Sequence, residues 1–148
     1  MLNIVVSGPR TWEGDWLHTY LRGEFVELIK EYDIKRGEPV TVHEGEAAGF
    51  DLTVKSIVQG FGWEVREYPI VSWYNADGDY NPQAGHIRNE RMISQSNADF
   101  GIVGVMKCEK HACRLKVEHM THGSADAFKR MTNYGIEVRL VNPYDIKT

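Results

Sequence analysis

The sequence predicts an α/β fold in which helices cover both faces of a five-stranded, mainly parallel sheet. Short apolar runs alternate along the chain with longer stretches whose apolar residues step by three or four positions. Glycine, proline and polar residues separate these segments and mark turns. Hydrophobic residues make up 42% and charged residues 26% of the 148 residues, which is ordinary for one globular domain. We therefore expect a single domain spanning residues 1–148, with strands that pair in parallel because helices connect them.

The first half of the chain contains three predicted strands and two predicted helices. Residues 2–6 form an apolar run and predict the first strand. Apolar residues then recur at helical spacing over 16–32, and 39–43 predicts the second strand. After a turn that contains glycine, residues 50–61 have the spacing of a second helix, and 63–68 alternate as a third strand.

The second half continues the alternation but contains an insertion. Asn81-Pro82 predicts a helix start, because asparagine can cap a helix and proline fits its first turn. Residues 100–105 predict the fourth strand, and the irregular insertion at 106–121 is rich in cysteine, histidine and lysine. A helix over 124–134 and a strand over 136–141 complete the order. This order is typical of a three-layer, Rossmann-like architecture.

Bulk properties exclude several classes of protein. No apolar run approaches the roughly 18 residues of a membrane helix, so we expect no membrane partner. The first six residues lack the basic and long apolar regions of a signal peptide, which indicates a cytoplasmic protein. In that reducing compartment Cys108 and Cys113 are not expected to form a structural disulfide. The formal net charge of −4 disfavours nucleic acid as a partner.

Polar residues and glycines follow the first two strands, at the sheet edge where ligands bind in this architecture. Gly8 permits a close backbone approach and Arg10 can pair bidentately with phosphate, although a plain turn with a solvated arginine fits equally well. Gly45 indicates backbone close to another group. Asp51 could accept hydrogen bonds from ribose hydroxyls, but its spacing favours a first-turn acid that complements the helix dipole.

The later connections add a cation and small residues at predicted helix starts. Arg88 and Asn89 lie near a helix N-terminus, where the macrodipole disfavours a cation unless an anion sits beside it. The alternative is a solvated, charged helix face. Gly123 and Ser124 could bind an anion at the next helix start, or Ser124 could be an ordinary cap. Four such places together predict a phosphate-bearing ligand over the C-terminal ends of the strands.

Five short elements, in order, resemble those of a known family. They are G-P-R-T-W at 8–12, H-E-G…G-F-D at 43–51, A-G-H-I-R-N-E-R-M at 84–92, A-D at 98–99 with T-H-G-S-A-D at 121–126, and G-I-E-V at 135–138. They are similar to the elements of the YspA-like branch of the SLOG superfamily, which is related to the LOG and DprA proteins and common in phage and bacterial genomes. The likeness runs from Val5 to about Val141, and it implies the host cytoplasm if the protein is phage-encoded.

This resemblance implies a Rossmann-like fold and a nucleotide-derived ligand. The implied contacts are Gly8, Arg10, Gly45, Asp51, Arg88, Asn89, Gly123 and Ser124. Relatives often pair through helices, which is compatible with a homo-oligomer.

Several residues depart from the family pattern. Glu44 replaces the first glycine of the H-G element and Glu46 adds a second acid, so these carboxylates could repel a phosphate or recruit Mg²⁺. LOG enzymes cleave the N-glycosidic bond of nucleoside monophosphates with an arginine and a glutamate. Their glutamate position falls here on Ala127, one residue after Asp126, and Asn89 replaces the lysine of their R-K pair.

Three functions therefore remain as hypotheses. The first is binding or sensing of a nucleotide-derived small molecule. The second is a nucleotide hydrolase in which Arg88 orients the phosphate and an acid, Asp126 first among the candidates, acts on the ribose. The third is single-stranded DNA binding in the manner of DprA, which aromatic and arginine residues permit but the net acidity disfavours.

The insertion carries a candidate metal site. Two cysteines and three histidines fall within fifteen residues, and thiolates with imidazoles suit Zn²⁺. The candidate ligands are Cys108, Cys113, His119 and His122. Their spacing is not that of a standard zinc finger, and a lysine-rich surface loop whose thiols bind nothing is the alternative. His122 is also a candidate ligand contact, since it precedes Gly123.

Overall fold

The structure, a computed structural model, describes residues 1–111, 113–115 and 117–148. Its five strands form one sheet in the order β3-β2-β1-β4-β5, and every neighbouring pair is parallel. The strands are β1 (Leu2–Ser7), β2 (Val40–Glu44), β3 (Glu64–Glu67), β4 (Phe100–Gly104) and β5 (Glu137–Val141). The predicted α/β architecture is confirmed.

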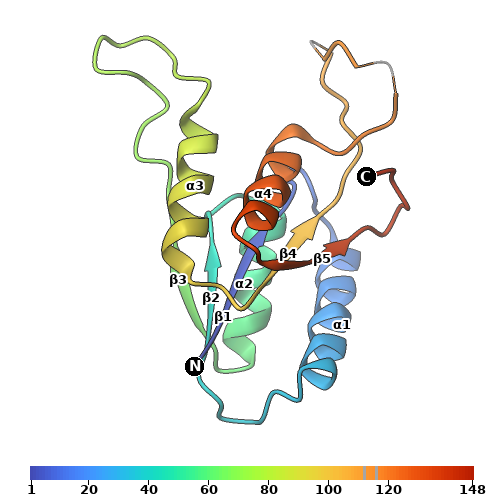
Figure 1. Cartoon of the computed structure of the whole chain (residues 1–148). Coiled ribbons are helices and arrows are strands. Elements are labelled where there is room, and N and C mark those ends of the chain that lie inside the picture. Colours follow the sequence, from blue (N-terminus) through green and yellow to red (C-terminus); the bar gives the residue numbers. More distant parts are fainter. Residues whose placement is uncertain (112, 116) are drawn as a thin grey trace.

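Two helices cover each face of this sheet, which gives three layers (Figure 1). The helices are α1 (Asp15–Glu31), α2 (Phe50–Gly60), α3 (Ala84–Ser96) and α4 (His122–Asn133). Alternate residues of the central strand β1 supply the two cores: Ile4 and Val6 pack with α1 and α2, whereas Val5 packs with α3 and α4. All three side chains are fully buried, as expected for a parallel strand between two helical layers.

Two helices begin at positions that differ from the prediction. Helix α3 begins at Ala84, because Asn81 forms a turn of its own: its side-chain oxygen accepts the N–H of Gln83 and its carbonyl accepts the N–H of Ala84. Helix α4 begins at His122 rather than Ser124, since the Thr121 carbonyl already accepts the N–H of Ala125. Ser124 therefore lies buried inside the first turn and is not the capping residue.

Two long connections extend from the end of the sheet at which the strands terminate, one before α3 and one between β4 and α4 (Figure 1). The first contains a bridge between Tyr74 and Tyr80, and the second contains an antiparallel bridge between Lys107 and Met120. These connections rise above the carboxyl edge of the sheet, where the candidate site lies. Among the described residues, no helix has the length and apolar character needed to cross a bilayer.

Candidate functional site

A cleft of about 470 Å³ opens at the carboxyl edge of the sheet. The residues after β1 and those after β4 form its floor, and the first turns of α3 and α4 border it. Strand order reverses between β1 and β4, since the chain builds β2 and β3 to one side and β4 and β5 to the other. Ligands of such sheets bind at this switch point.

The cleft gathers most of the predicted ligand contacts. Its lining includes Gly8, Arg10, Asp51, Arg88, Asn89, Gly123 and Ser124. Gly45 is the predicted contact that lies outside this lining. Sequence reasoning missed three further lining residues that can contact a ligand: Lys110, His86 and Thr11. The aromatic residue Trp73 also lines the cleft.

Two glycines dock the first loop against the start of α2. A Cβ on Gly8 would overlap the ring of Phe50, and the N–H of Phe50 donates to the Pro9 carbonyl at 3.2 Å. Gly49 has a φ of +75°, and a Cβ there would lie 2.6 Å from the carbonyl oxygen of Arg10. Backbone packing between these loops therefore fixes the position of residues 8–10 in the cleft.

The structure gives a reason for glycine at position 45 that the sequence did not reveal. A Cβ on this residue would overlap the guanidinium of Arg88, which donates through Nη1 to the Gly45 carbonyl oxygen. The predicted close approach is therefore present, but the neighbour is a protein side chain.

Arg88 is a buried cation that forms no ion pair with a carboxylate among the described residues. It is 8% exposed, and its Nε donates to Asn89 Oδ1 at 3.1 Å. Within the described part of the chain, none of the ion pairs includes Arg88. Burial lowers the pKa of Arg88, the charge of Asp51 raises it and Arg10 lowers it. Because buried charges are normally paired, this guanidinium can accommodate an anion in the cleft.

Asp51 supplies an acceptor in the same cleft. It is 2% exposed, and its Oδ2 accepts the N–H groups of Gly45 and Ala47 at 3.1 and 3.2 Å. Its other oxygen, Oδ1, is buried and has no hydrogen-bond partner among the described residues. Burial raises the pKa of Asp51 to about 6, opposed by those backbone N–H groups and by Arg88. One oxygen thus holds the turn before α2, and the other is available to a hydroxyl.

Positive groups dominate the electrostatics of the cleft. Arg10, Arg88 and Lys110 line it, whereas Asp51 is the one carboxylate among its described lining residues. The N-termini of α3 and α4 add the positive ends of their dipoles. The guanidinium of Arg10 lies 5.2 Å from the ring centroid of Trp73. In a molecule of net charge −4, this cleft is suited to an anion.

Glu44 and Glu46 do not line the cleft. Glu44 is fully buried at the end of β2, and its Oε2 accepts the N–H of Glu46 at 2.9 Å. Burial, together with the charge of Asp51 and a hydrogen bond with Glu67, raises the pKa of Glu44 to about 8. These acids therefore lie outside the cleft lining, although Glu44 is close enough to Asp51 and Arg88 for their charges to interact.

Asp126 lies behind Asn89 rather than in the cleft lining. It accepts hydrogen bonds from Asn89 Nδ2 at 3.0 Å and Arg130 Nε at 2.9 Å, and its Oδ1 lies 3.0 Å from His86 Nδ1. Burial raises the pKa of Asp126, but these three partners together hold it below the usual value. The arrangement suits a residue that orients Asn89 and His86.

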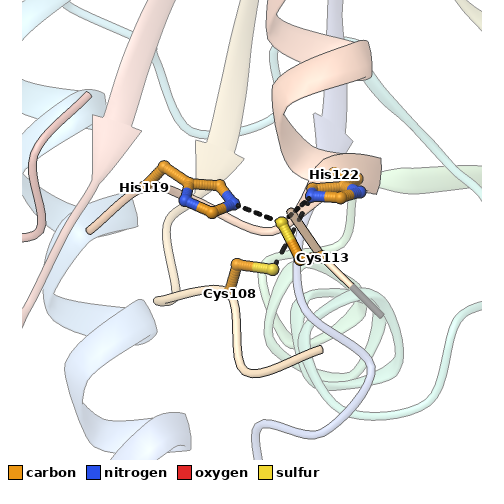
Figure 2. Close-up of side chains that lie close together, drawn as sticks. All are labelled: Cys108, Cys113, His119 and His122. Atoms are coloured by element: carbon orange, nitrogen blue, oxygen red, sulfur yellow. Dashed lines mark hydrogen bonds between the residues drawn. The ribbon is translucent and has the colours of Figure 1, made fainter. Parts of the chain in front are cut away.

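The four candidate metal ligands of the insertion also come together. The ligand atoms of Cys108, Cys113, His119 and His122 all lie within 4.8 Å of one another, and both thiols are free (Figure 2). His111 is not a member of this cluster.

Comparisons with known proteins show a likeness of fold to a solved structure. No family model matches the chain, and no curated protein sequence matches it. The structure of DNA processing protein A (DprA) from Streptococcus pneumoniae superposes with a TM-score of 0.62 at 13% identity. The superposition covers 98% of this chain and 52% of that one, so the chain spans about half the length of its structural neighbour. The five-stranded parallel sheet with its flanking helices therefore has a Rossmann-like fold similar to that of DprA.

Proposed function

We propose that the protein binds or senses a nucleotide-derived, phosphate-bearing small molecule in the cleft between β1 and β4. The observation that carries this proposal is the buried guanidinium of Arg88, which lines the cleft and has no carboxylate partner among the described residues. A phosphate would supply that partner. The motif elements at 8–12, 84–92 and 121–126 support assignment to the YspA-like branch.

The side chains of the cleft suggest which residues would contact each part of a nucleotide. Its phosphate would contact Arg88, Arg10 and the first turn of α4, where Gly123 and Ser124 lie. A ribose hydroxyl would donate to Asp51 Oδ1, and the base would stack on Trp73. The volume of about 470 Å³ is within the range of small-molecule sites.

A thermal-shift screen followed by calorimetry would test this proposal with AMP, CMP, ADP-ribose and cyclic nucleotides. We expect at least one of them to raise Tm, because a ligand that binds only the folded state stabilises it. Arg10→Ala is the main variant, since Arg10 is exposed and its loss should not unfold the protein. It should weaken binding about tenfold or more, as expected for loss of a charge-assisted hydrogen bond.

Arg36→Ala is the matched control, because Arg36 is also an exposed loop arginine but lies outside the cleft. It should bind like the unmodified protein. If no nucleotide stabilises the protein at millimolar concentration, or if both variants bind equally well, the proposal is wrong.

Single-stranded DNA is a second candidate, because the structural neighbour is a DNA processing protein and the cleft combines arginines with Trp73. Fluorescence anisotropy with a labelled oligonucleotide at low salt separates the two candidates. A hydrolase of the LOG type is less well supported, since three partners hold Asp126 outside the cleft lining. Free base released from AMP or CMP, and abolished by Arg88→Ala, would favour the hydrolase instead.

A further inference from the structure

We propose that Cys108, Cys113, His119 and His122 bind a structural Zn²⁺ ion that orders the insertion and fixes the start of α4. The four side chains converge from separate places: Cys108 and Cys113 lie in the loop after β4, His119 lies near its end, and His122 is the first residue of α4 (Figure 2). This site shares His122 with the cleft, but its existence does not depend on a nucleotide ligand.

Three distances between the ligand atoms fit a tetrahedral zinc site, and all four atoms lie within 4.8 Å of one another. Zn–S and Zn–N bonds of roughly 2.3 and 2.0–2.1 Å at tetrahedral angles place sulfur and nitrogen about 3.6 Å apart. Cys113 Sγ lies 3.4 Å from Nε2 of both His119 and His122, and Cys108 Sγ lies 3.7 Å from Nε2 of His122. A Cys₂His₂ set is also a common donor set of closed, structural zinc sites.

The hydrogen bonding of His119 is that of a metal ligand. Its Nδ1 lies 2.7 Å from the carbonyl oxygen of Val117, and only a protonated Nδ1 can donate there. That tautomer leaves a lone pair on Nε2, the atom nearest to Cys113. Zinc-bound histidines are commonly oriented by such a bond from the second ring nitrogen to a backbone carbonyl.

Backbone pairing holds two of the ligands opposite each other. The N–H of Cys108 donates to the carbonyl of His119 at 2.8 Å, and the N–H of Thr121 donates to the carbonyl of Met106 at 2.9 Å. These bonds flank the bridge between Lys107 and Met120 and join the two ends of the insertion. Cys108 and His119 are thereby held opposite each other.

The described tip of the insertion buries little apolar surface, whereas Met120 near its end packs in a small core cluster. The apolar side chains of the tip, Leu115 and Val117, are 62% and 70% exposed, so they contribute little to a core. A short segment that cannot bury enough apolar surface is typically ordered by a metal or by disulfides. Both cysteines here are free thiols, which leaves them available to a metal.

Metal analysis of the full chain, purified under reducing conditions without chelators, tests the inference directly. We expect about one zinc per chain. After replacement by Co²⁺, we expect the visible d–d bands of a tetrahedral site and a thiolate-to-cobalt charge-transfer band. These spectra of the unmodified protein do not depend on whether a variant folds.

Variants then identify the ligands. Cys113→Ser and His119→Ala should lose zinc, whereas His111→Ala should retain it, because His111 lies in the same insertion but outside the cluster. Absence of zinc after reconstitution with reduced thiols, a Co²⁺ spectrum without the charge-transfer band, or a Cys108–Cys113 disulfide in freshly purified protein would each overturn the inference. All of these readouts are independent of nucleotide binding, so failure of this site and failure of the cleft proposal are distinguishable.

Discussion

Single residues around the cleft combine support of the fold with contact to a ligand. Arg88 contacts Gly45 and Asn89, and Asp51 holds the turn before α2, yet both line the cleft. Sequence reasoning singled out Arg88 because a cation near a helix start needs an anion. It could not reveal that Gly45 makes room for that guanidinium, since the two residues are 43 positions apart and meet only in the folded sheet.

The buried carboxyl of Glu44 predicts a specific dependence of stability on pH. Its pKa rises from 4.5 to about 8 on folding, so between these values the folded protein binds a proton that the unfolded chain does not. Stability therefore falls as pH rises through this window, by at most about 1.4 kcal/mol per pH unit. The other large shifts end lower: the pKa of Asp51 rises to about 6, and burial lowers that of His43 from 6.5 to about 4. Among the buried groups with large pKa shifts, Glu44 is therefore the one whose protonation controls stability between pH 6.5 and 8.

Glu44→Gln removes this titration while preserving the shape of the side chain. We expect the free energy of unfolding of the unmodified protein to decline between pH 6.5 and 8, and that of the variant to stay nearly flat. Urea unfolding at half-unit pH steps measures both. Glu38→Gln is the control, since Glu38 lies in a loop outside this cluster and should keep the decline. Parallel curves for the unmodified protein and Glu44→Gln would show that Glu44 is ionised in the folded protein.

At the scale of elements, sequence patterns predicted all nine helices and strands of the described residues, but two helix starts were wrong. The apolar pattern of α4 begins at Ala125, whereas its first turn holds His122 and Gly123. No apolar spacing marks those residues, because they border the cleft rather than the core. The start of α3 was placed too early because Asn81-Pro82 is equally suited to the separate turn that it forms.

Asn97, which follows α3, has a strained backbone conformation whose energetic cost can be measured. Asn97 follows the helix with φ 47° and ψ 43°, a left-handed conformation in which glycine is more stable than any residue with a Cβ. Asn97→Gly should stabilise the protein by a few tenths to about 1 kcal/mol, and Asn97→Val should destabilise it by more than 1 kcal/mol. Urea unfolding measures both changes. Gly60→Ala serves as a contrast, because a Cβ at Gly60 meets nothing within 4 Å and the residue lies in helix α2. A stabilising effect of Asn97→Val would contradict the assigned backbone.

At the scale of the molecule, one topological rule accounts for how much of the candidate site the sequence could predict. Parallel strands end at the same edge, so residues far apart in sequence, such as Arg10, Arg88 and Gly123, were expected together and do line one cleft. The rule does not predict the path of the insertion. That path depends on the β-bridge between Lys107 and Met120 and on the cluster of cysteines and histidines. Lys110 was therefore missed as a residue of the cleft, although its segment was marked as unusual.

The proposed zinc site and the proposed ligand cleft share His122, and Lys110 lies in the insertion that carries the proposed zinc site while it lines the cleft. If both proposals hold, metal and ligand should be coupled, because an ion that fixes these two residues reduces the ordering cost of binding the ligand. We expect removal of zinc to weaken binding of the best nucleotide from the screen about five- to tenfold.

Thermodynamic linkage makes this prediction reciprocal: the same nucleotide must raise zinc affinity by the same factor. Calorimetry of the nucleotide with zinc-loaded and zinc-free protein gives the first factor, and zinc competition with a chromophoric chelator, with and without nucleotide, gives the second. His111→Ala should preserve both factors, since His111 belongs neither to the cluster nor to the cleft lining. If zinc does not change nucleotide affinity and the nucleotide does not change zinc affinity, the ion stabilises the insertion without any influence on the cleft.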